Sequence, residues 1–256
     1  MVNLILAGIW GAFGVGVIHG IGAETGTQVL LIAAIGGAAA AYVLLARPRL
    51  LSWGATRLES EEPLPGDDLL AKADLTATRA ITIRAPADQV WPWIAQLGQG
   101  RGGFYSFDFL ENLVGCDIHS ADRIVHEWQE VEVGDEVRFA PEVGLVVALL
   151  ERGRSFVLRG GIPMGNIAPP YDFTWAFVLR AEPDETTRLL VRERYSYTRP
   201  WAFLLVEPTE AVSFVMSQKM LRGVRNRAER AASPPPDRFL RAAVDDHLDQ
   251  EGTIGS

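Results

Sequence analysis

Cysteine is nearly absent from the 256-residue chain, and so is an excess of positive charge. Cys116 is the single cysteine, so the chain forms no internal disulfide and no metal site built from several cysteines. One free thiol fits a reducing compartment. The 24 lysines and arginines are outnumbered by 32 acidic residues, which gives a net charge of −8. Because binding along a phosphate backbone needs a basic face, nucleic acid is not an expected partner.

Charged residues are also missing from the first 46 positions, where Glu24 is the one exception. Two apolar runs, residues 4–22 and 29–46, are separated by a short polar link. As a helix each run would span roughly 27–28 Å, which matches the hydrocarbon core of a bilayer. Both runs contain several glycines, and small residues let two helices approach closely in lipid. We therefore expect residues 1–50 to form a transmembrane helical hairpin that contacts the membrane through residues 4–46.

Basic residues begin directly after the second run, at Arg47, Arg49 and Arg57, with Trp53 nearby as an interfacial ring. Since positive charge beside a membrane helix favours the cytoplasmic side, we expect a protein of the cell membrane whose domain faces the cytoplasm. A cleaved signal peptide is the alternative interpretation of the first run. Against it, the run lacks a basic start and is followed by a second apolar run.

Two segments outside the domain have the composition of connectors. Residues 51–75 contain Pro63, Pro65 and Gly66 together with an acidic excess, and we interpret them as a linker. Three consecutive prolines at 234–236 mark the other end of the domain. Residues 233–256 are acidic, and we expect them to form a flexible tail.

Residues 76–232 have the pattern of an α+β domain. A strand is expected at 78–84 from its apolar–polar alternation, followed by a helix at 85–97 that Pro92 should bend. A short second helix is expected at 107–114. A series of strands joined by tight turns then predicts an antiparallel meander, with strands at 127–133, 136–140, 143–150, 155–159, 172–180 and 187–198.

A long helix should end the domain, from Glu207 to about Ala231. Apolar residues repeat along it at four-residue spacing, which predicts one buried stripe. The stripe consists of Val212, Met216, Met220 and Val224.

The last two expected strands separate their side chains by face. One face is aromatic and apolar, with Phe173, Trp175, Phe177 and Tyr195. The other presents arginines and is expected to be solvated, with Arg188, Arg192 and Arg194. Glu193 is an acid on the apolar face, so its burial would require a partner or a raised pKa. The favoured explanation is that a nearby arginine or tyrosine satisfies it or that a bulge turns it outward, and a role in ligand binding is the alternative.

Residues 98–124 combine features expected at the mouth of a ligand cavity. Four glycines open the stretch, and an aromatic run that includes Tyr105 follows. The stretch ends in a polar cluster that contains Glu111, Asn112 and His119. Aromatic and ionisable groups crowded onto a short irregular segment are typical of a binding site. The alternative is a capped surface helix with an aromatic underside.

The order of elements, together with local sequence, resembles a known superfamily. Residues 85–91 resemble the usual entry to the first helix of the START-like superfamily (SRPBCC; polyketide cyclase/dehydrase and lipid-transport proteins). Residues 98–124, 127–129 and 133–137 resemble a bacterial branch of it. The resemblance implies a helix-grip fold over about 76–231, in which a curved antiparallel sheet wraps the final helix and leaves an apolar cavity. It implies no catalytic residues, since the fold hosts carriers, cyclases and subunits alike.

Three functions are compatible with these residues. The favoured one is a membrane-tethered domain that binds a lipid or another hydrophobic small molecule in an internal cavity. The second is a cyclase- or dehydratase-type enzyme that acts on a hydrophobic carbonyl substrate through His119, Tyr105 and a carboxylate. The third is an interaction module whose interior is filled by its own side chains. For the first function, the expected ligand-binding residues are Arg101, Tyr105, Glu111, Asn112, His119, Phe173, Trp175, Phe177, Glu193 and Tyr195.

No cofactor or metal is expected. Asp117, His119, Asp122 and His126 have the residue types of a metal site with oxygen and nitrogen ligands. On a strand the first two would share a face and on a helix the last two would, so no single regular element presents all four. Capping and hydrogen bonds within the loop are the favoured explanation.

Overall fold

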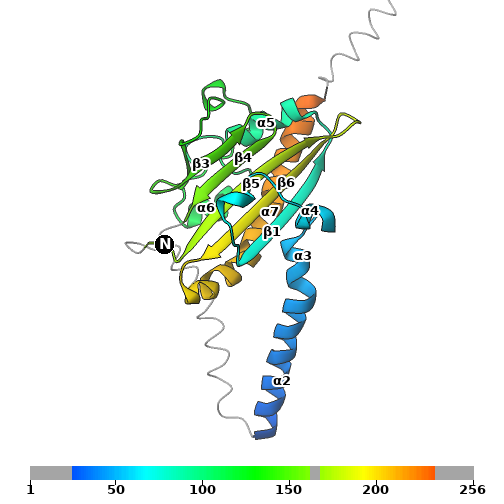
Figure 1. Ribbon diagram of the computed structural model, residues 1–256, viewed down its shortest axis with the longest axis vertical. Coiled ribbons are helices and arrows are strands. Elements are labelled where there is room, and N and C mark those ends of the chain that lie inside the picture. The colour runs from blue at the N-terminus through cyan, green and yellow to red at the C-terminus, as the bar shows by residue number, and fades with distance from the viewer. Residues whose placement is uncertain (1–24, 162–167, 234–256) are drawn as a thin grey trace, which may run out of the picture.

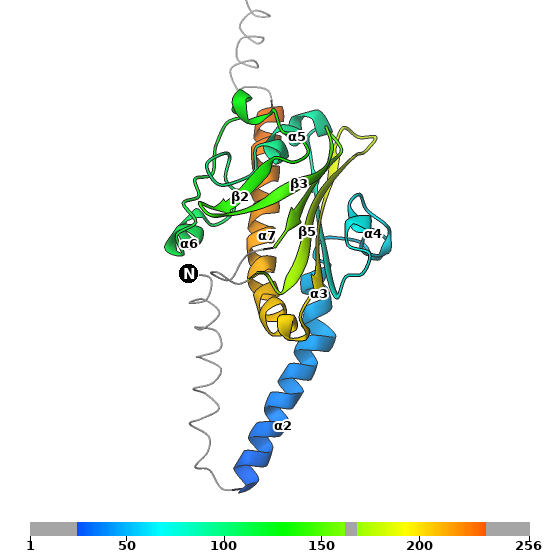
Figure 2. The same cartoon turned by 60° about the vertical axis from the view of Figure 1, so that its left-hand side comes forward.

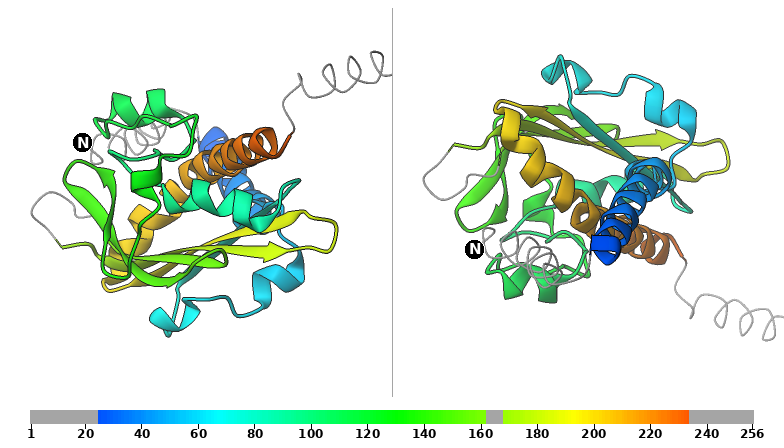
Figure 3. Two further views of the ribbon diagram at one scale, coloured as in Figure 1. Left: turned by 90° about the horizontal axis from the view of Figure 1, so that it is seen from above. Right: turned by 90° about the horizontal axis from the view of Figure 1, so that it is seen from below.

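The computed structural model describes residues 25–161 and 168–233, which form an α+β domain preceded by a long helix (Figure 1). The domain is built on one six-stranded antiparallel sheet with the strand order β1-β6-β5-β4-β3-β2. A 30-residue helix, α7 (Phe203–Ala232), lies across one face of this sheet (Figure 3). This arrangement agrees with the helix-grip fold that the resemblance implies. The strands are β1 (Leu75–Ile83), β2 (Glu136–Ala140), β3 (Val143–Glu151), β4 (Ser155–Gly160), β5 (Tyr171–Ala181) and β6 (Thr187–Tyr197).

Antiparallel pairing fixes which side chains share a face. β5 pairs with β6 along its whole length, and β6 pairs with β1, so the first and last strands of the domain are neighbours. β3 has a register shift against both β2 and β4, and such bulges bend a sheet. The five strands predicted between 136 and 198 are confirmed to within one residue at each end.

The predicted strand at 127–133 is wrong. That segment forms one 3-10 turn, η3 (His126–Trp128), followed by irregular chain. Arginine side chains bind its backbone carbonyls where a neighbouring strand would otherwise do so. Arg152 donates to the carbonyls of Gln129 and Val131 at 3.2 and 3.0 Å. With those acceptors occupied, the segment needs no partner in the sheet.

Two short helices lie on the same face of the sheet as α7 (Figure 3). α5 (Ala87–Ala95) contains Pro92, as expected, and buries its apolar side in the core. α6 (Asp108–Leu113) confirms the short helix predicted at 107–114. Between them the chain makes a tight turn in which Gly98 and Gly103 form an isolated bridge. Their φ angles of 128° and 69° lie in the region that favours glycine.

The buried face of α7 differs from the predicted stripe. Met220 and Val224 are buried, as expected, but Val212 is 45% exposed. In this half of the helix the buried face passes through Glu210 and Ser217 instead. In this half of α7 the sheet presents charged groups to the helix, and the helix therefore buries polar side chains against them.

The second face of the sheet is not solvated, contrary to the expectation from its arginines. Residues 51–75, predicted to be a linker, fold over this face as the helix α4 (Arg57–Glu61) and the 3-10 turn η2 (Asp67–Leu69) (Figure 3). Four ion pairs join acids of the segment to arginines of the sheet, and Arg192 is buried among them. These pairs are Glu59–Arg188 at 2.7 Å, Glu62–Arg180 at 2.7 Å, Asp67–Arg192 at 2.6 Å and Asp67–Arg194 at 3.6 Å. The segment is therefore a packed part of the domain.

One long helix leads away from the domain (Figure 2). α2 (Thr25–Ala41) continues through a π-helical turn, η1 (Tyr42–Ala46), into α3 (Arg47–Leu51). Within the described residues, Leu30–Leu51 is the one stretch long and apolar enough to cross a membrane, and none of it is buried in the protein. The first run of the predicted hairpin, 4–22, lies outside the described residues, as do residues 234–256 of the predicted tail. The structure thus supports one candidate span where the sequence predicts two.

Trp53, expected at the membrane interface, belongs to the domain. It packs against the core, and the guanidinium of Arg222 lies 5.3 Å from its ring. Its carbonyl accepts a hydrogen bond from Ala80 N of β1 at 3.0 Å. The chain therefore meets the sheet immediately after α3.

Glu59 gives the outer segment a pH-dependent attachment to the sheet. Hydrogen bonding to Arg188 lowers the pKa of the Glu59 carboxyl from 4.5 to about 2. A group with a lowered folded pKa stabilises the fold above its unfolded pKa, and this contribution is lost as pH falls towards the folded pKa. We expect Glu59→Gln to lower the thermal midpoint at pH 7, and the difference from the unaltered protein to shrink between about pH 5 and pH 2.

Glu61→Gln is the matched control for this prediction. Glu61 pairs with Arg57 at 2.8 Å, but both side chains are exposed, so its replacement should change the midpoint little at any pH. Circular-dichroism melts at pH 7, 4 and 2.5 measure both variants. A Glu59→Gln difference that stays constant over this range would contradict the role of the ion pair.

Candidate functional site

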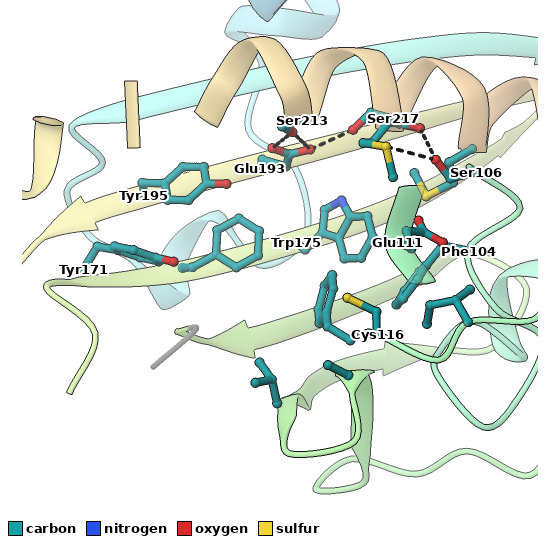
Figure 4. A pocket seen from close by; sticks show the side chains of 17 residues that line it. Phe104, Ser106, Glu111, Cys116, Tyr171, Trp175, Glu193, Tyr195, Ser213 and Ser217 are labelled. Carbon is teal, nitrogen blue, oxygen red and sulfur yellow. Dashed lines mark hydrogen bonds between the residues drawn. The ribbon is translucent and has the colours of Figure 1, made fainter. Parts of the chain in front are cut away.

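A cavity of about 310 Å³ lies between α7 and the sheet, with α6 at its side (Figure 4). Side chains from α6, α7, four strands and the loops near α6 contribute to its wall. The lining residues are Phe104, Ser106, Glu111, Cys116, Ile118, Phe139, Ala140, Val143, Tyr171, Phe173, Trp175, Glu193, Tyr195, Ser213, Met216, Ser217 and Met220. The interior is therefore hollow here, and the structure does not have the filled interior that the third function requires.

Six of the 17 lining residues are aromatic. Phe104, Phe139 and Trp175 form a cluster with ring centroids 5.0–5.9 Å apart. Farther along the sheet, the rings of Phe173 and Tyr195 lie 4.6 Å apart. Residues 173 and 175 share a face because side chains alternate along β5, and the β5–β6 register places Tyr195 opposite Phe173. Alternation along two paired strands thus builds a continuous apolar surface under α7.

Glu193 is a buried acid in this wall, and its partners satisfy it. Arg79 of β1 donates from Nη1 to Oε1 at 2.9 Å, and the Arg79 side chain is only 1% exposed. Ser213 donates to the carboxylate at 2.7 Å and Ser217 at 3.0 Å, from one face of α7 (Figure 4). The prediction that a nearby arginine pairs with Glu193 is confirmed. These bonds anchor α7 to the sheet beside the cavity.

Glu111 differs from Glu193 in having no such partners. It projects from α6 into the cavity, and its Oε2 is buried without a hydrogen bond. Burial, with a smaller contribution from the nearby Asp108 carboxylate, raises the Glu111 pKa to about 7. A second buried polar atom of the wall, the indole N–H of Trp175, also lacks a partner. The cavity therefore offers one titratable carboxyl and one unused donor.

Five of the ten predicted ligand-binding residues line the cavity: Glu111, Phe173, Trp175, Glu193 and Tyr195. The other five lie elsewhere among the described residues: Arg101, Tyr105, Asn112, His119 and Phe177. Three of these five have their polar groups bound within the fold, one is exposed, and one is in the core.

Tyr105 is fully buried beside α7, outside the cavity. Its hydroxyl accepts from Gln96 Nε2 at 2.9 Å and donates to the carbonyl of Trp93 at 3.1 Å. Burial raises its pKa above the ordinary value. Gly223 of α7 lies so close that a Cβ there would be 2.3 Å from the Tyr105 carbonyl oxygen. Tyr105 thus fixes the position of α7.

Arg101 and Asn112 hold the loop in shape. Arg101 donates to the carbonyls of Ala95 and Trp128 at 3.0 and 2.5 Å. Asn112 accepts from Ile118 N at 2.6 Å and donates to the carbonyl of the same residue at 2.8 Å. The polar atoms of both side chains are bound to backbone groups and are therefore not available to a ligand.

His119 and Phe177 do not reach the cavity either. The His119 side chain is 81% exposed and contacts Asp117 at 3.2 Å, while Phe177 is fully buried against Phe156. His119, Tyr105 and a carboxylate therefore do not converge on one point, as the cyclase or dehydratase hypothesis requires. Within the described part of the chain, no three metal-binding side chains are grouped to hold an ion.

Several lining residues were not predicted, and the most informative are Ser213 and Ser217. They are spaced four residues apart in α7, so they share a face. A signal for them existed: an acid expected on the apolar face of a sheet needs donors from the helix that covers it. Cys116 also borders the cavity, and burial raises the pKa of its thiol.

The Arg79–Glu193 pair predicts a strong effect of breaking it from one side. Arg79→Met should leave Glu193 buried without a counter-charge and lower the free energy of unfolding by about 3–5 kcal/mol. The double variant Arg79→Met/Glu193→Met should recover most of this loss, because an apolar pair of similar volume often replaces a buried ion pair at little cost. Urea unfolding of the full-length protein measures both. A double variant as unstable as the single one would show that the two residues act independently.

Comparison with known proteins gives structural likenesses only. Neither a family model nor a curated protein matches the sequence. Among solved structures, the chain is similar to the Zhui aromatase/cyclase from Streptomyces sp. R1128, with 18% identity over 62% of this chain and 96% of that one and a TM-score of 0.38. It is also similar to the hypothetical protein jhp0584 from Helicobacter pylori (12% identity, 68% and 99% coverage, TM-score 0.40) and to MLL2253 from Mesorhizobium loti (14%, 61% and 98%, 0.36). Scores this low support no argument about function, which therefore has to come from the site itself.

Proposed function

We propose that this protein is a membrane-anchored domain that takes a lipid or another hydrophobic small molecule into the cavity beneath α7. The observation behind the proposal is the cavity itself, a space of about 310 Å³ lined mainly by apolar and aromatic side chains. Ligand sites are typically concave and apolar, with a few polar groups that orient the ligand. Glu111 and Trp175 supply such groups here.

The size of the cavity narrows the choice of ligand. A volume of about 310 Å³ lies at the low end of the roughly 300–1,000 Å³ found for small-molecule sites. It suits one alkyl chain or a small ring system better than a lipid with two chains. The proposed ligand is accordingly a single-chain amphiphile or a compound of similar bulk.

The helix that precedes the domain supports the membrane part of the proposal. Leu30–Leu51 has the length and composition of a membrane span. At its end, Arg47 makes three hydrogen bonds to the Glu207 carboxylate of α7, at 2.8–3.0 Å. The span is thus attached to the same helix that covers the cavity, and an apolar ligand dissolved in the bilayer would lie close to its binding site.

Exposed apolar side chains at the start of α7 fit the same arrangement. Trp201, Phe203 and Leu204 are 44–48% exposed. They lie within a few residues of Glu207, the partner of Arg47, and so at the end of the domain from which the span leaves (Figure 2). Aromatic residues favour the interface between headgroups and water. These side chains would rest at that level of the bilayer.

An acid–base enzyme is the second candidate, and Glu111 is the observation that favours it. A carboxyl with a pKa of about 7 in an apolar cavity is suited to proton transfer near neutral pH. The catalytic group would be Glu111 in place of His119 and Tyr105. Product formation from a bound carbonyl compound, lost in Glu111→Gln while binding persists, would favour the enzyme over the carrier.

Filling the cavity should abolish binding. Val143 lines the cavity at the start of β3, and Val143→Phe would place a ring in the space that the ligand needs. We expect this variant to lose at least about tenfold in affinity for decanol, a single-chain probe. Native mass spectrometry of full-length protein released from detergent micelles counts the bound probe directly.

Val146→Phe is the matched control, since Val146 lies on the same strand but is exposed. It should bind decanol as the unaltered protein does. If neither the unaltered protein nor the control binds the probe, or if Val143→Phe binds it equally well, the cavity is not a ligand site.

The span predicts stable insertion in membranes. Ala40→Asp/Val43→Asp places two charges near the middle of Leu30–Leu51, where each costs about 3 kcal/mol. We expect carbonate washing to leave the unaltered protein in the membrane pellet and to release the double variant. The control Leu58→Asp changes an exposed leucine of the domain and should stay in the pellet. Intact mass identifies the alternative outcome, in which the N-terminal segment is removed as a signal sequence.

A further inference from the structure

The charged groups of the cavity wall restrict the polar end of the ligand. The wall contains two acids, Glu111 and Glu193, and the described residues that line it include no lysine, arginine or histidine. A carboxylate or phosphate on the ligand would therefore meet acids and find no cation in the wall. Burial would make that mismatch costly, because a charge moved out of water needs a partner.

Glu193 is already neutralised and leaves little for a ligand to bind. Its carboxylate accepts from Arg79 and from two serines of α7 at 2.7–3.0 Å. The Arg79 guanidinium is directed to this carboxylate and to the carbonyl of Leu50. The Glu193 carboxylate is thus fully used within the fold. Arg79 Nη2 is buried without a partner but does not line the cavity, so the ligand has to be recognised elsewhere.

The Glu111 carboxyl is the group that a ligand can bind. Among the described residues, none of the charged and titratable groups around it pairs with it. Asp108, on the same helix, accepts two hydrogen bonds from Ser120 and adds negative charge. The Cys116 thiol follows α6, and Glu193 stands across the cavity. On α7, the ammonium of Lys219 lies 5.7 Å from the Phe107 ring and is not part of the cavity wall.

Trp175 complements this acid with a donor. Its Nε1 is buried without a partner, and the indole ring forms part of the same cavity wall. A group that donates to Glu111 and has a free lone pair for the indole N–H would satisfy both unpartnered atoms. A hydroxyl does so. A protonated amine has no lone pair and leaves the indole N–H unpartnered, but it brings a positive charge to the carboxylate.

Building on the proposed function, we infer that the cavity selects amphiphiles whose polar end donates hydrogen bonds, with a primary amine as the best fit and an anionic end as the worst. An ammonium would form a charge-assisted hydrogen bond with Glu111, which is stronger than the neutral bond made by a hydroxyl. A fatty acid would bring a second negative charge next to an unpaired acid. The expected order of affinity is amine, then alcohol, then carboxylate.

Three probes with the same alkyl chain test this order: decylamine, decanol and decanoic acid. Each is titrated separately into the full-length protein in detergent micelles at pH 8.5, and native mass spectrometry counts the bound probe. Glu111→Gln keeps the shape of the side chain and removes its charge. We expect it to weaken decylamine binding by at least about tenfold and to change decanol binding by less than about threefold.

Two controls separate the site from the acidic surface. Glu130→Gln removes an exposed acid and should leave all three affinities unchanged. Val143→Phe blocks the cavity and measures binding outside it. Because burial raises the Glu111 pKa to about 7, decylamine affinity should fall as pH is lowered from 8.5 to 5.5, whereas the amine itself stays charged. In Glu111→Gln this pH dependence should disappear.

The outcomes distinguish this inference from the proposed function. Equal affinities for the three probes, tighter binding of decanoic acid, or an equal loss in Glu130→Gln would overturn the headgroup preference and leave the cavity as a ligand site. Absence of binding by all three probes, or binding that Val143→Phe does not reduce, would overturn both. An amine preference that Glu111→Gln removes would support both.

Discussion

The buried ion pair between Arg79 and Glu193 determines how the parts of this protein fit together. The guanidinium belongs to β1 and the carboxylate to β6, while the serines that share the carboxylate come from α7. The same guanidinium donates to the carbonyl of Leu50, the last residue but one of α3, at 3.2 Å. Removing two charges from water costs several kcal/mol each, so this pair persists only with these surrounding hydrogen bonds. The sheet, α7 and α3 therefore meet at one polar point.

The cavity follows from the way α7 meets that point. In its second half the helix packs on the core with Met220, Leu221 and Val224, which are nearly fully buried. In its first half it meets the sheet through Ser213 and Ser217. Serine side chains satisfy the acid but are too short to fill the space between helix and sheet. The aromatic residues of β5 and β6 consequently face a hollow, and Glu111 borders it without a partner.

Local patterns predicted the strands and short helices, whereas groups distant in sequence decided the site. The strands from 136 to 198 are clear from alternation and turn residues, and the wall residues on β5 and β6 follow from the same alternation. The buried face in the first half of α7 was predicted wrongly because it depends on Arg79, which is more than 130 residues away from the serines it contacts. Arg101, Asn112 and Tyr105 are residue types that can bind either a ligand or other parts of the fold, and here their hydrogen bonds are made within the fold. The face of the sheet that carries the β6 arginines was predicted to be solvated. The acids that cover these arginines lie in residues 51–75, whose composition resembles that of a linker.

The close contact between Gly223 and Tyr105 also determines where the covering helix is stiff. At Gly223 the two backbones touch, so no side chain larger than hydrogen fits and the helix has no room to shift towards the loop. Near its other end α7 contains Pro208, which removes one intrahelical hydrogen bond. A helix that is held in place at Gly223 and lacks a hydrogen bond at Pro208 bends most easily near Pro208. Any widening of the cavity is therefore easiest at the first turns of α7, beside α3, and hardest where Tyr105 contacts the helix.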